Sequence, residues 1–255
     1  SGLLGAPTRW GKTTLIKNTV RAFDGVCTIV VAPGIDLVKQ LYEDIKQAVP
    51  HLDVRMLYGG SKKTTQSRHV TVVSMDSLDK CDPCMTRLIL VDEPHALPTD
   101  GRLPDFLRFE RARKYGFGAT LDGRFDGKDP IIRGVIGPVL AERTYLEAVQ
   151  EGAIAPIKII MLEIPIQGYN AFNRARVQRN LLFENPQVGQ AVRCLCDPAY
   201  QMWPADWQIL GFIDNEKQAN FISENMNGIP HQIAMAKLMT DQQRIQCMDD
   251  PKTAK

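Results

Sequence analysis

The stretch that most constrains the fold is residues 6–13, which read APTRWGKT. An apolar segment at residues 2–5 precedes it, and a helical pattern begins at Thr13. A loop between a strand and a helix directs backbone N–H groups and the positive end of the helix dipole at a bound phosphate. Lys12 adds a positive charge, and the Thr13 hydroxyl is a suitable ligand for Mg²⁺. The stretch therefore predicts a phosphate-binding loop within an α/β fold.

A second motif, DEPH at residues 92–95, follows the apolar run at residues 88–91. Parallel sheets bind ligands at the carboxyl ends of their strands, and both motifs fall at such ends. We expect Asp92 to hold Mg²⁺ together with Thr13, and Glu93 to orient and activate the attacking water. A plain turn and a solvated strand end are the alternative interpretations, and the shared strand-end setting argues against both.

ATP and Mg²⁺ are the cofactors that these two motifs predict. Lys12, Asp92 and Glu93 are the candidate catalytic residues, with Lys12 neutralising charge on the β- and γ-phosphates. The residues expected to surround ATP are Ala6, Pro7, Thr8, Arg9, Trp10, Gly11, Lys12, Thr13 and Thr14. Ala6 and Arg9 both stand where such loops commonly have glycine. A side chain at position 9 restricts the backbone and places a charge near the phosphates.

Short apolar runs alternate with helical patterns in the first part of the chain. The runs expected to form buried strands are residues 26–32, 70–74, 88–91 and 115–119. A helix with apolar residues at every fourth position is expected behind Asp36, which has the side chain of an N-cap. Strands that alternate with helices predict a parallel sheet covered on both faces. We assign residues 1–154 to this domain.

The chain is punctuated near Pro156, and a second, incomplete α/β domain is expected over residues 155–255. Two strands are predicted there, at residues 157–164 and 208–213. The predicted helices are a basic stretch at residues 173–180, a helix from about residue 216, and a last helix opened by the capping-box pattern at residues 240–243.

Composition narrows the classes of function. The net charge is +2 at pH 7, so nucleic-acid binding must come from local basic patches. No apolar stretch has membrane-spanning length and no signal peptide is evident, so no membrane partner is expected. The 6 cysteines form no regular framework, which indicates a reducing compartment such as the cytoplasm. Cys81 and Cys84 form one CxxC pair, for which free thiols are favoured over a metal site.

In the order of its motifs, the chain resembles DExH-type DNA helicases and translocases of superfamily 2, in particular the UvsW- and RecG-like branch of phages and bacteria. The segments that resemble motifs I, Ia, Ib, II and III are residues 6–13, 32–40, 73–78, 92–95 and 118–120. Residues 58–60 look like the family's Gly-Gly turn, and residues 209–214 stand where motif IV would be. The resemblance covers nearly the whole chain. It implies a RecA-like P-loop NTPase domain followed by a partial second RecA-like domain.

The resemblance implies an ATP-dependent motor that moves on or remodels nucleic acid in replication, recombination or repair, with DNA favoured over RNA. It implies that His95, Ala119 and Thr120 couple the ATP site to the nucleic acid. The residues that it implies for contact with the sugar-phosphate backbone are Pro33, Gly34, Gln40, Gly59, Gly60 and Ser74. Protein partners in a replication, repair or restriction assembly are compatible with it.

Two parts of the family pattern have no counterpart here: the base-reading segment before motif I, and motifs V and VI with their transition-state arginine. We therefore expect a fragment that binds ATP–Mg²⁺ weakly and hydrolyses it poorly. Two basic clusters, at residues 108–114 and 174–179, are expected to be solvated helix faces in preference to phosphate sites.

Other functions stay open from the sequence. A terminase-like DNA-packaging ATPase also has an unusual residue before Gly-Lys-Thr and an Asp-Glu pair. It would add a nuclease domain with clustered acidic residues, and no such cluster follows residue 156. A helicase-like module that binds nucleotide or a partner without hydrolysis is another possibility, against which Lys12, Asp92 and Glu93 argue. A restriction-enzyme motor subunit would have the same sequence pattern.

Overall fold

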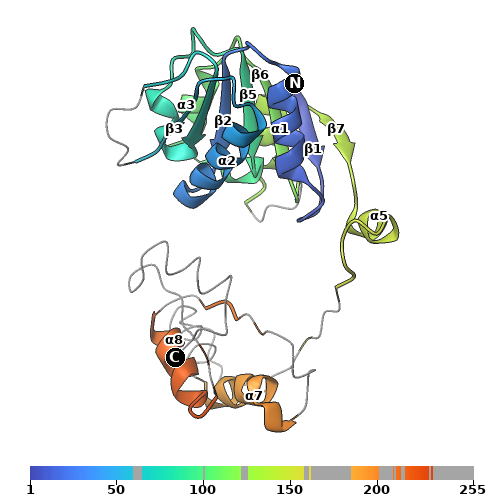
Figure 1. The fold of residues 1–255 in the computed structure, drawn as a ribbon. Helices are drawn as coiled ribbons and strands as arrows, with labels where there is room; N and C mark the ends of the chain where they lie inside the picture. Colours follow the sequence, from blue (N-terminus) through green and yellow to red (C-terminus); the bar gives the residue numbers. More distant parts are fainter. Residues whose placement is uncertain are drawn as a thin grey trace. The chain divides into compact units, whose positions relative to one another are not determined.

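The computed structural model describes residues 1–59, 65–99, 101–121, 126–157, 161, 185–200, 209, 211–213, 216–229 and 231. The chain divides into two compact units, Ser1–Lys158 and Ile159–Lys255 (Figure 1). The boundary expected from the sequence, between residues 154 and 155, lies close to this division. That the two units are two functional domains stays a prediction.

A parallel sheet forms the centre of the first unit. Its strands are β1 (Gly2–Gly5), β2 (Thr28–Ala32), β3 (Val54–Leu57), β4 (Val70–Ser74), β5 (Leu88–Asp92), β6 (Arg113–Gly118) and β7 (Val139–Glu142). Their order is β3-β4-β2-β5-β6-β1-β7. All pairings between neighbours are parallel. The predicted α/β class with a parallel sheet is confirmed.

Helices cover both faces of this sheet (Figure 1). They are α1 (Lys12–Ala22), α2 (Ile35–Ala48), α3 (Leu103–Leu107) and α4 (Asp129–Ile136), with 3-10 turns η1 (Met75–Lys80) and η2 (Pro94–Ala96). Helix α5 (Tyr145–Gln150) follows β7 and lies apart from the sheet. Ile16 of α1 and Leu41 of α2 share one core cluster with Val30 of β2. Phe106 of α3 shares the other cluster with Val31. Successive residues of a strand point to opposite faces, so the two clusters lie on either side of the sheet.

The degree of burial explains which strands were predictable. All residues of β2 and β4 are buried, as expected inside a sheet covered on both faces. The strand predicted at residues 70–74 coincides with β4, and the other three differ by one or two residues at their ends. β3 and β7 were missed. Each has only 4 residues, β3 carries Arg55, and most of β7 is exposed.

Two local predictions are wrong. The N-cap of α2 is Gly34, whose backbone is extended (φ −143°, ψ 161°), and not Asp36, which lies in the first turn. The Asp36 carboxylate instead interacts with the positive end of the helix dipole. The basic segment at residues 108–114 is not a helix face, because α3 ends at Leu107 and β6 begins at Arg113.

The described elements of the second unit are α7 (Pro186–Cys196), η4 (Pro198–Tyr200) and α8 (Glu216–Asn225). Arg193 joins α7 to the end of α8 by donating to the carbonyls of Asn225 (2.9 Å) and Asn227 (3.1 Å). A Cβ at Gly189 would lie 2.6 Å from the Asn225 side chain, so the two helices pack closely there. The helix predicted from about residue 216 is confirmed.

Other predictions for this unit lie wholly or mainly outside the described residues. These are the basic stretch at 173–180, the helix at 240–243 and much of the two strands. The described residues within the predicted strands have no strand structure, and Met161 and Phe212 are 91% and 90% exposed. An apolar run becomes a buried strand only where neighbouring elements cover it. Burial is not observed at these positions.

The part of the chain that the structure describes has no helix long and apolar enough to cross a membrane. It also has no group of three or more His, Cys, Asp or Glu side chains that could hold a metal ion. The thiols of Cys81 and Cys84 are free. Burial raises the pKa of the Cys81 thiol to about 12, which keeps it protonated and unreactive.

Candidate nucleotide and nucleic-acid site

Apart from Gln40, which lies within α2, the described site residues predicted from the motifs lie along one edge of the sheet. Because the strands are parallel, their carboxyl ends meet there. The loop at residues 6–11 follows β1, residues 33–34 follow β2, and Gly59 follows β3. Ser74 ends β4, Asp92 ends β5, and residues 119–120 follow β6. The topology therefore brings together motifs that are far apart in the sequence.

The strand order divides this carboxyl edge into two halves. Neighbouring strands β1, β6 and β5 carry the loop, residues 119–120 and the acidic motif. Neighbouring strands β2, β4 and β3 carry residues 33–34, Ser74 and Gly59. The two halves meet where β5 pairs with β2. Residues predicted to bind ATP and residues predicted to bind nucleic acid thus occupy adjacent halves of one edge.

The loop enters α1 without a side-chain cap. Gly11 is the N-cap, in a left-handed conformation (φ 107°, ψ 26°), and the first turn contains no acidic residue. Ala6 donates its N–H to the carbonyl of Gly118 (2.9 Å), and Trp10 donates to the carbonyl of Pro7 (3.2 Å). The N–H groups at the start of an uncapped helix are a favourable site for an anion such as phosphate.

Lys12 and Glu93 form an ion pair that joins the two motifs. Nζ of Lys12 lies 2.5 Å from Oε1 of Glu93, and the side chains are 13% and 24% exposed. Oε2 of Glu93 lies 3.2 Å from Nδ1 of His95. The Glu93 carboxylate is therefore held between a lysine of the loop and a histidine of the DEPH motif.

Asp92 lies beside this ion pair in a partly buried position. Burial, together with the neighbouring Glu93 carboxylate, raises the pKa of its carboxyl group to about 6, although Lys12 opposes both effects. A carboxylate in such a place is stabilised by a cation next to it. Mg²⁺ takes oxygen ligands and needs only one or two from the protein, so Asp92 and the Thr13 hydroxyl fit it by their chemistry.

The backbone of β6 positions both motifs. The carbonyl of Phe117 accepts the N–H of Glu93 (2.9 Å), and the carbonyl of Gly118 accepts from the first residue of the loop. Pro94 packs so closely on β6 that a Cβ at Gly116 would lie 3.2 Å from its side chain. Sequence reasoning missed this role, although two glycines within one strand indicate a close approach of another backbone.

Backbone strain within the described residues is confined to this site. Arg9 (φ 69°) and Glu93 (φ 52°) are the two non-glycine residues there with positive φ. The left-handed conformation costs a residue with a Cβ about 1–2 kcal/mol. Strain of this kind persists where surrounding structure imposes it, and it is often found at functional sites.

The remaining predicted residues differ in how accessible they are. Gln40 and Gly59 are exposed, as are His95, Ala119 and Thr120, whereas Pro33 and Gly34 are half-buried. Ser74 is only 4% exposed, so of this set it offers its hydroxyl least readily to a ligand. Gly60 lies outside the described residues.

Comparison with known families gives one match. Residues 1–122 match the model of the family described as type III restriction enzyme, res subunit. This range contains all the motifs from the loop to residues 118–120. Comparison with curated proteins gives no match.

Several solved structures are similar to the chain. One is a hypothetical ATP-dependent RNA helicase from Sulfolobus tokodaii (18% identity, TM-score 0.47, 56% of this chain and 48% of that chain). Another is the UvsW helicase from bacteriophage T4 (19% identity, TM-score 0.43, 55% and 53%). A third is Dbp5 of S. cerevisiae bound to RNA and ADP BeF3 (15% identity, TM-score 0.47, 56% and 41%). The chain spans about half the length of the solved structures that it matches.

Proposed function

We propose that this chain is an ATP-dependent motor that moves on or remodels nucleic acid, with DNA favoured over RNA. The observation that carries the proposal is the linked set Lys12–Glu93–His95, which lies beside Asp92 and the uncapped start of α1. The match of residues 1–122 to a restriction-enzyme subunit family supports it. The preference for DNA rests on the UvsW- and RecG-like order of the sequence motifs.

ATP binding would require Lys12 to exchange its partner, because Glu93 neutralises the Lys12 charge in this structure. Lys12 is bonded to the Glu93 carboxylate, and phosphate oxygens would replace that carboxylate as its partner. Glu93 would then be free to orient the attacking water and accept its proton. Arg9 adds a second positive charge in the same loop.

Mg²⁺ would be held by Thr13 and Asp92, and it would neutralise charge that develops on the phosphates during transfer. The remaining chemistry falls to the chain itself. Backbone N–H groups of the loop and of the first turn of α1 would bind the phosphates and fix their orientation. The carbonyl of Phe117 holds the N–H of Glu93 and so keeps this base in place.

His95 is the proposed link between ATP and nucleic acid. Its ring contacts Glu93, so a change of partner at Glu93 also changes the surroundings of His95. Pro33, Gly34 and Gln40 would contact the sugar-phosphate backbone on the adjacent half of the edge, together with the segment at residues 59–60. Such contacts carry no sequence preference.

The test is ATP hydrolysis by the full chain with and without single-stranded DNA, branched DNA and RNA. Lys12→Ala removes the phosphate-binding charge. Lys17→Ala is the matched control, because Lys17 also lies on α1 but faces Asp44 of α2 at 3.4 Å. We expect one polymer to stimulate hydrolysis, and the stimulation to be lost in Lys12→Ala and kept in Lys17→Ala. Hydrolysis at the Lys12→Ala level with every polymer would refute motor activity of this chain and favour the module that binds nucleotide without hydrolysis.

A further inference from the structure

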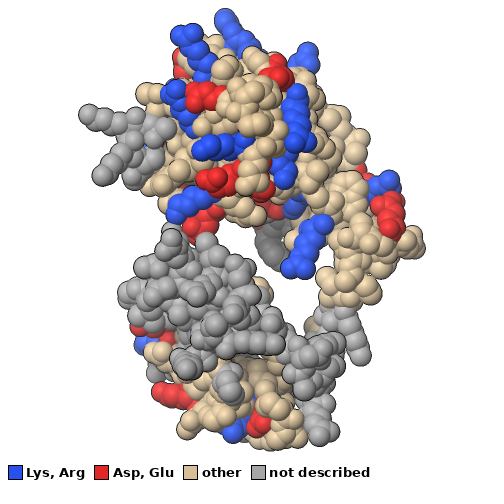
Figure 2. All heavy atoms as spheres, viewed as in Figure 1, with Lys and Arg blue, Asp and Glu red and all other residues tan. Residues whose placement is uncertain are grey.

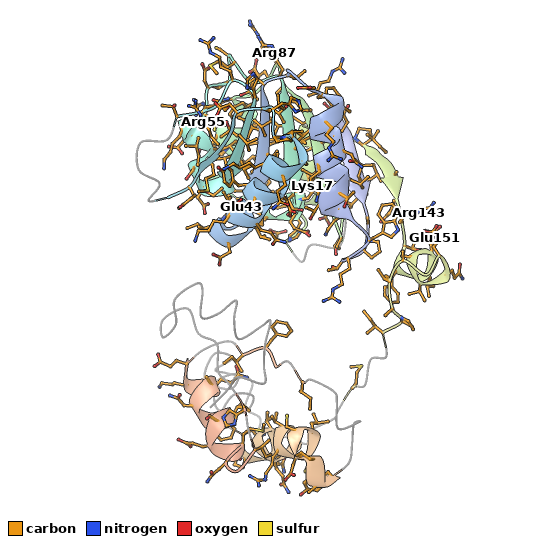
Figure 3. The ribbon with its side chains drawn as sticks, in the orientation of Figure 1. Lys17, Glu43, Arg55, Arg87, Arg143 and Glu151 are labelled. Carbon is orange, nitrogen blue, oxygen red and sulfur yellow. The ribbon has the colours of Figure 1, made fainter. Side chains whose placement is uncertain are left out.

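A row of basic side chains lies at the other end of the sheet, where the strands begin. Arg68 precedes β4, Arg87 precedes β5, and Arg111, Arg113 and Lys114 stand at the start of β6. We call these five residues the amino-edge row. Figure 3 labels Arg87 at this end of the first unit, and Figure 2 shows Lys and Arg spheres along the same margin.

The strand register places Arg87 beside Arg113, and β2 separates this pair from Arg68. Leu88 pairs with Arg113 on one side and with Thr28 on the other, and Thr28 pairs with Val70. Arg113 donates its N–H to the carbonyl of Arg87 (2.9 Å). Neighbouring strands lie about 4.8 Å apart, so the row extends over roughly 15 Å from β6 to β4.

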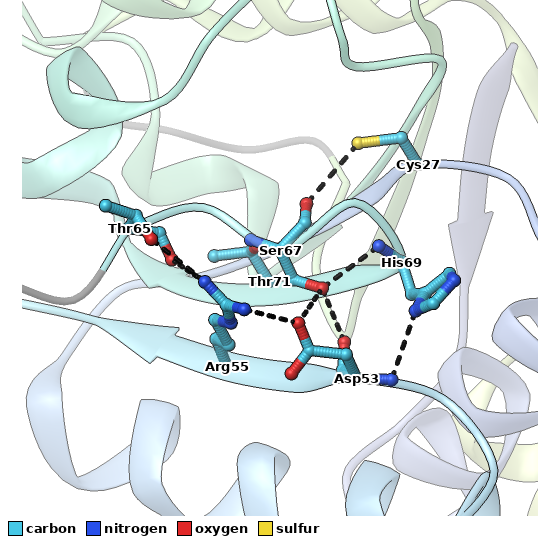
Figure 4. A network of polar contacts seen from close by, with 7 residues as sticks. All are labelled: Cys27, Asp53, Arg55, Thr65, Ser67, His69 and Thr71. Atoms are coloured by element: carbon cyan, nitrogen blue, oxygen red, sulfur yellow. Dashed lines mark hydrogen bonds and ion pairs between the residues drawn. The ribbon is translucent and has the colours of Figure 1, made fainter.

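A polar network fixes the backbone on both sides of Arg68 (Figure 4). Ser67 is fully buried, donates its hydroxyl to the carbonyl of Asp53 (2.6 Å) and accepts the N–H of His69 (3.0 Å). The N–H of Asp53 donates to Nδ1 of His69 (3.2 Å), and the Asp53 carboxylate pairs with Arg55 (2.8 Å). Because both neighbours of Arg68 are held, its side chain extends from a rigid base.

The row carries more positive charge than its surroundings neutralise. Residues 65–69, 82–87 and 110–114 contain five Lys or Arg and two Asp or Glu, a net charge of +3, and the segment that leads into the intervening strand β2 adds Asp24. Lys114 contributes least to the charge at the surface, because it is half-buried and its Nζ lies 5.2 Å from the centre of the Phe106 ring. Arg68, Arg111 and Arg113 are exposed. Within the described residues, none of these three has a carboxylate at ion-pair distance.

We propose that the amino-edge row binds the phosphate backbone of a second nucleic-acid segment, away from the carboxyl edge. Four of its five cations are arginines, whose planar guanidinium groups match phosphate oxygens. The large apolar side chains that are exposed in the described chain all lie outside the three segments. A protein interface has an apolar centre, so the row suits a polyanion better. This binding requires neither ATP nor the carboxyl edge.

The test measures the binding of a labelled 20-bp DNA duplex to the full chain without nucleotide. Fluorescence anisotropy gives the affinity K at salt concentrations from 50 to 200 mM. In Arg111→Gln/Arg113→Gln, the slope of log K against log salt should become shallower by about 0.9 for each charge removed, and the affinity at 50 mM salt should fall by at least about tenfold. Arg68→Gln tests the other end of the row. Lys217→Gln, at an exposed position of α8, removes the same single charge and should change neither quantity.

Unchanged affinity and slope in both row variants, with thermal unfolding like that of the wild type, would overturn the proposal. An equal loss in Lys217→Gln would also overturn it, because net charge alone would explain the result. Poly-glutamate serves as a competing polyanion. If it binds as tightly as DNA, and the same variants lose this binding, the row would be assigned to acidic protein segments instead. The assay contains no nucleotide, so its outcome does not depend on ATP hydrolysis.

Discussion

Replacing Arg9 with glycine should stabilise the fold while it weakens ATP binding. Arg9 has a φ of 69°, and this conformation costs a residue with a Cβ about 1–2 kcal/mol. Glycine removes that cost, but it also increases the backbone entropy of the unfolded chain, which lowers the stability by about 0.5–1 kcal/mol. The free energy of unfolding should therefore increase by about 0–1.5 kcal/mol, with a middle value near 0.75 kcal/mol. For a chain of this size, the middle value corresponds to a rise in Tm of roughly 2–3 °C.

The same substitution removes a positive charge from the phosphate-binding loop. A charge-assisted hydrogen bond to phosphate contributes about 1.5–3 kcal/mol, so the Kd for ATP–Mg²⁺ should rise by about 10- to 100-fold. Thermal unfolding and calorimetric titration of the same samples measure both effects. Arg9→Asn tolerates a left-handed backbone without the charge, so it should lose affinity equally. A lower Tm in Arg9→Gly, or an unchanged Kd in both variants, would refute this reasoning.

Three further predictions concern the site and the core. Glu93→Gln should lower kcat by about 10²- to 10⁴-fold while ATP still binds, and steady-state rates close to wild type would exclude Glu93 as the base. Gly116→Ala places a Cβ 2.7 Å from the Leu3 side chain and 3.2 Å from Pro94, so it should lower the free energy of unfolding by about 1–3 kcal/mol and reduce ATP hydrolysis. An unchanged urea midpoint would contradict it. Iodoacetamide at pH 8 should modify exposed Cys84 and not Cys81, whose pKa burial raises to about 12, as mass spectrometry can determine. The unfolded thiol ionises near pH 9 while the folded thiol stays protonated, so stability should fall from pH 9 to 12, and less so in Cys81→Ala.

The sheet was predictable where strands are buried on both faces. The run at residues 28–32 is apolar or β-branched throughout, and such continuity is typical of parallel strands covered by helices. Parallel strands also predict that the loop and the DEPH motif meet at one edge, since both follow strands. β3 and β7 lack this signal because they are short and lie at the two borders of the sheet.

The details that tertiary contacts decide could not be predicted. The N-cap of α2 depends on the extended backbone of Gly34, and because glycine has no capping side chain, the sequence does not indicate this position. The ion pair between Lys12 and Glu93 joins residues 81 positions apart, and its geometry depends on the carbonyl of Phe117 that holds Glu93. Arg9 was recognisable as a departure from glycine, but its strained conformation is visible only in three dimensions.

The central claim is that one edge of the sheet couples ATP binding to nucleic-acid binding. The most direct test is the affinity of the chain for a labelled single-stranded DNA. It is compared at saturating concentrations of a non-hydrolysable ATP analogue and of ADP. We predict Kd values that differ by about fivefold or more between the two nucleotides in the wild type, and equal values in Lys12→Ala. Equal affinities in the wild type, with both nucleotides bound, would contradict the coupling of the two halves of the edge.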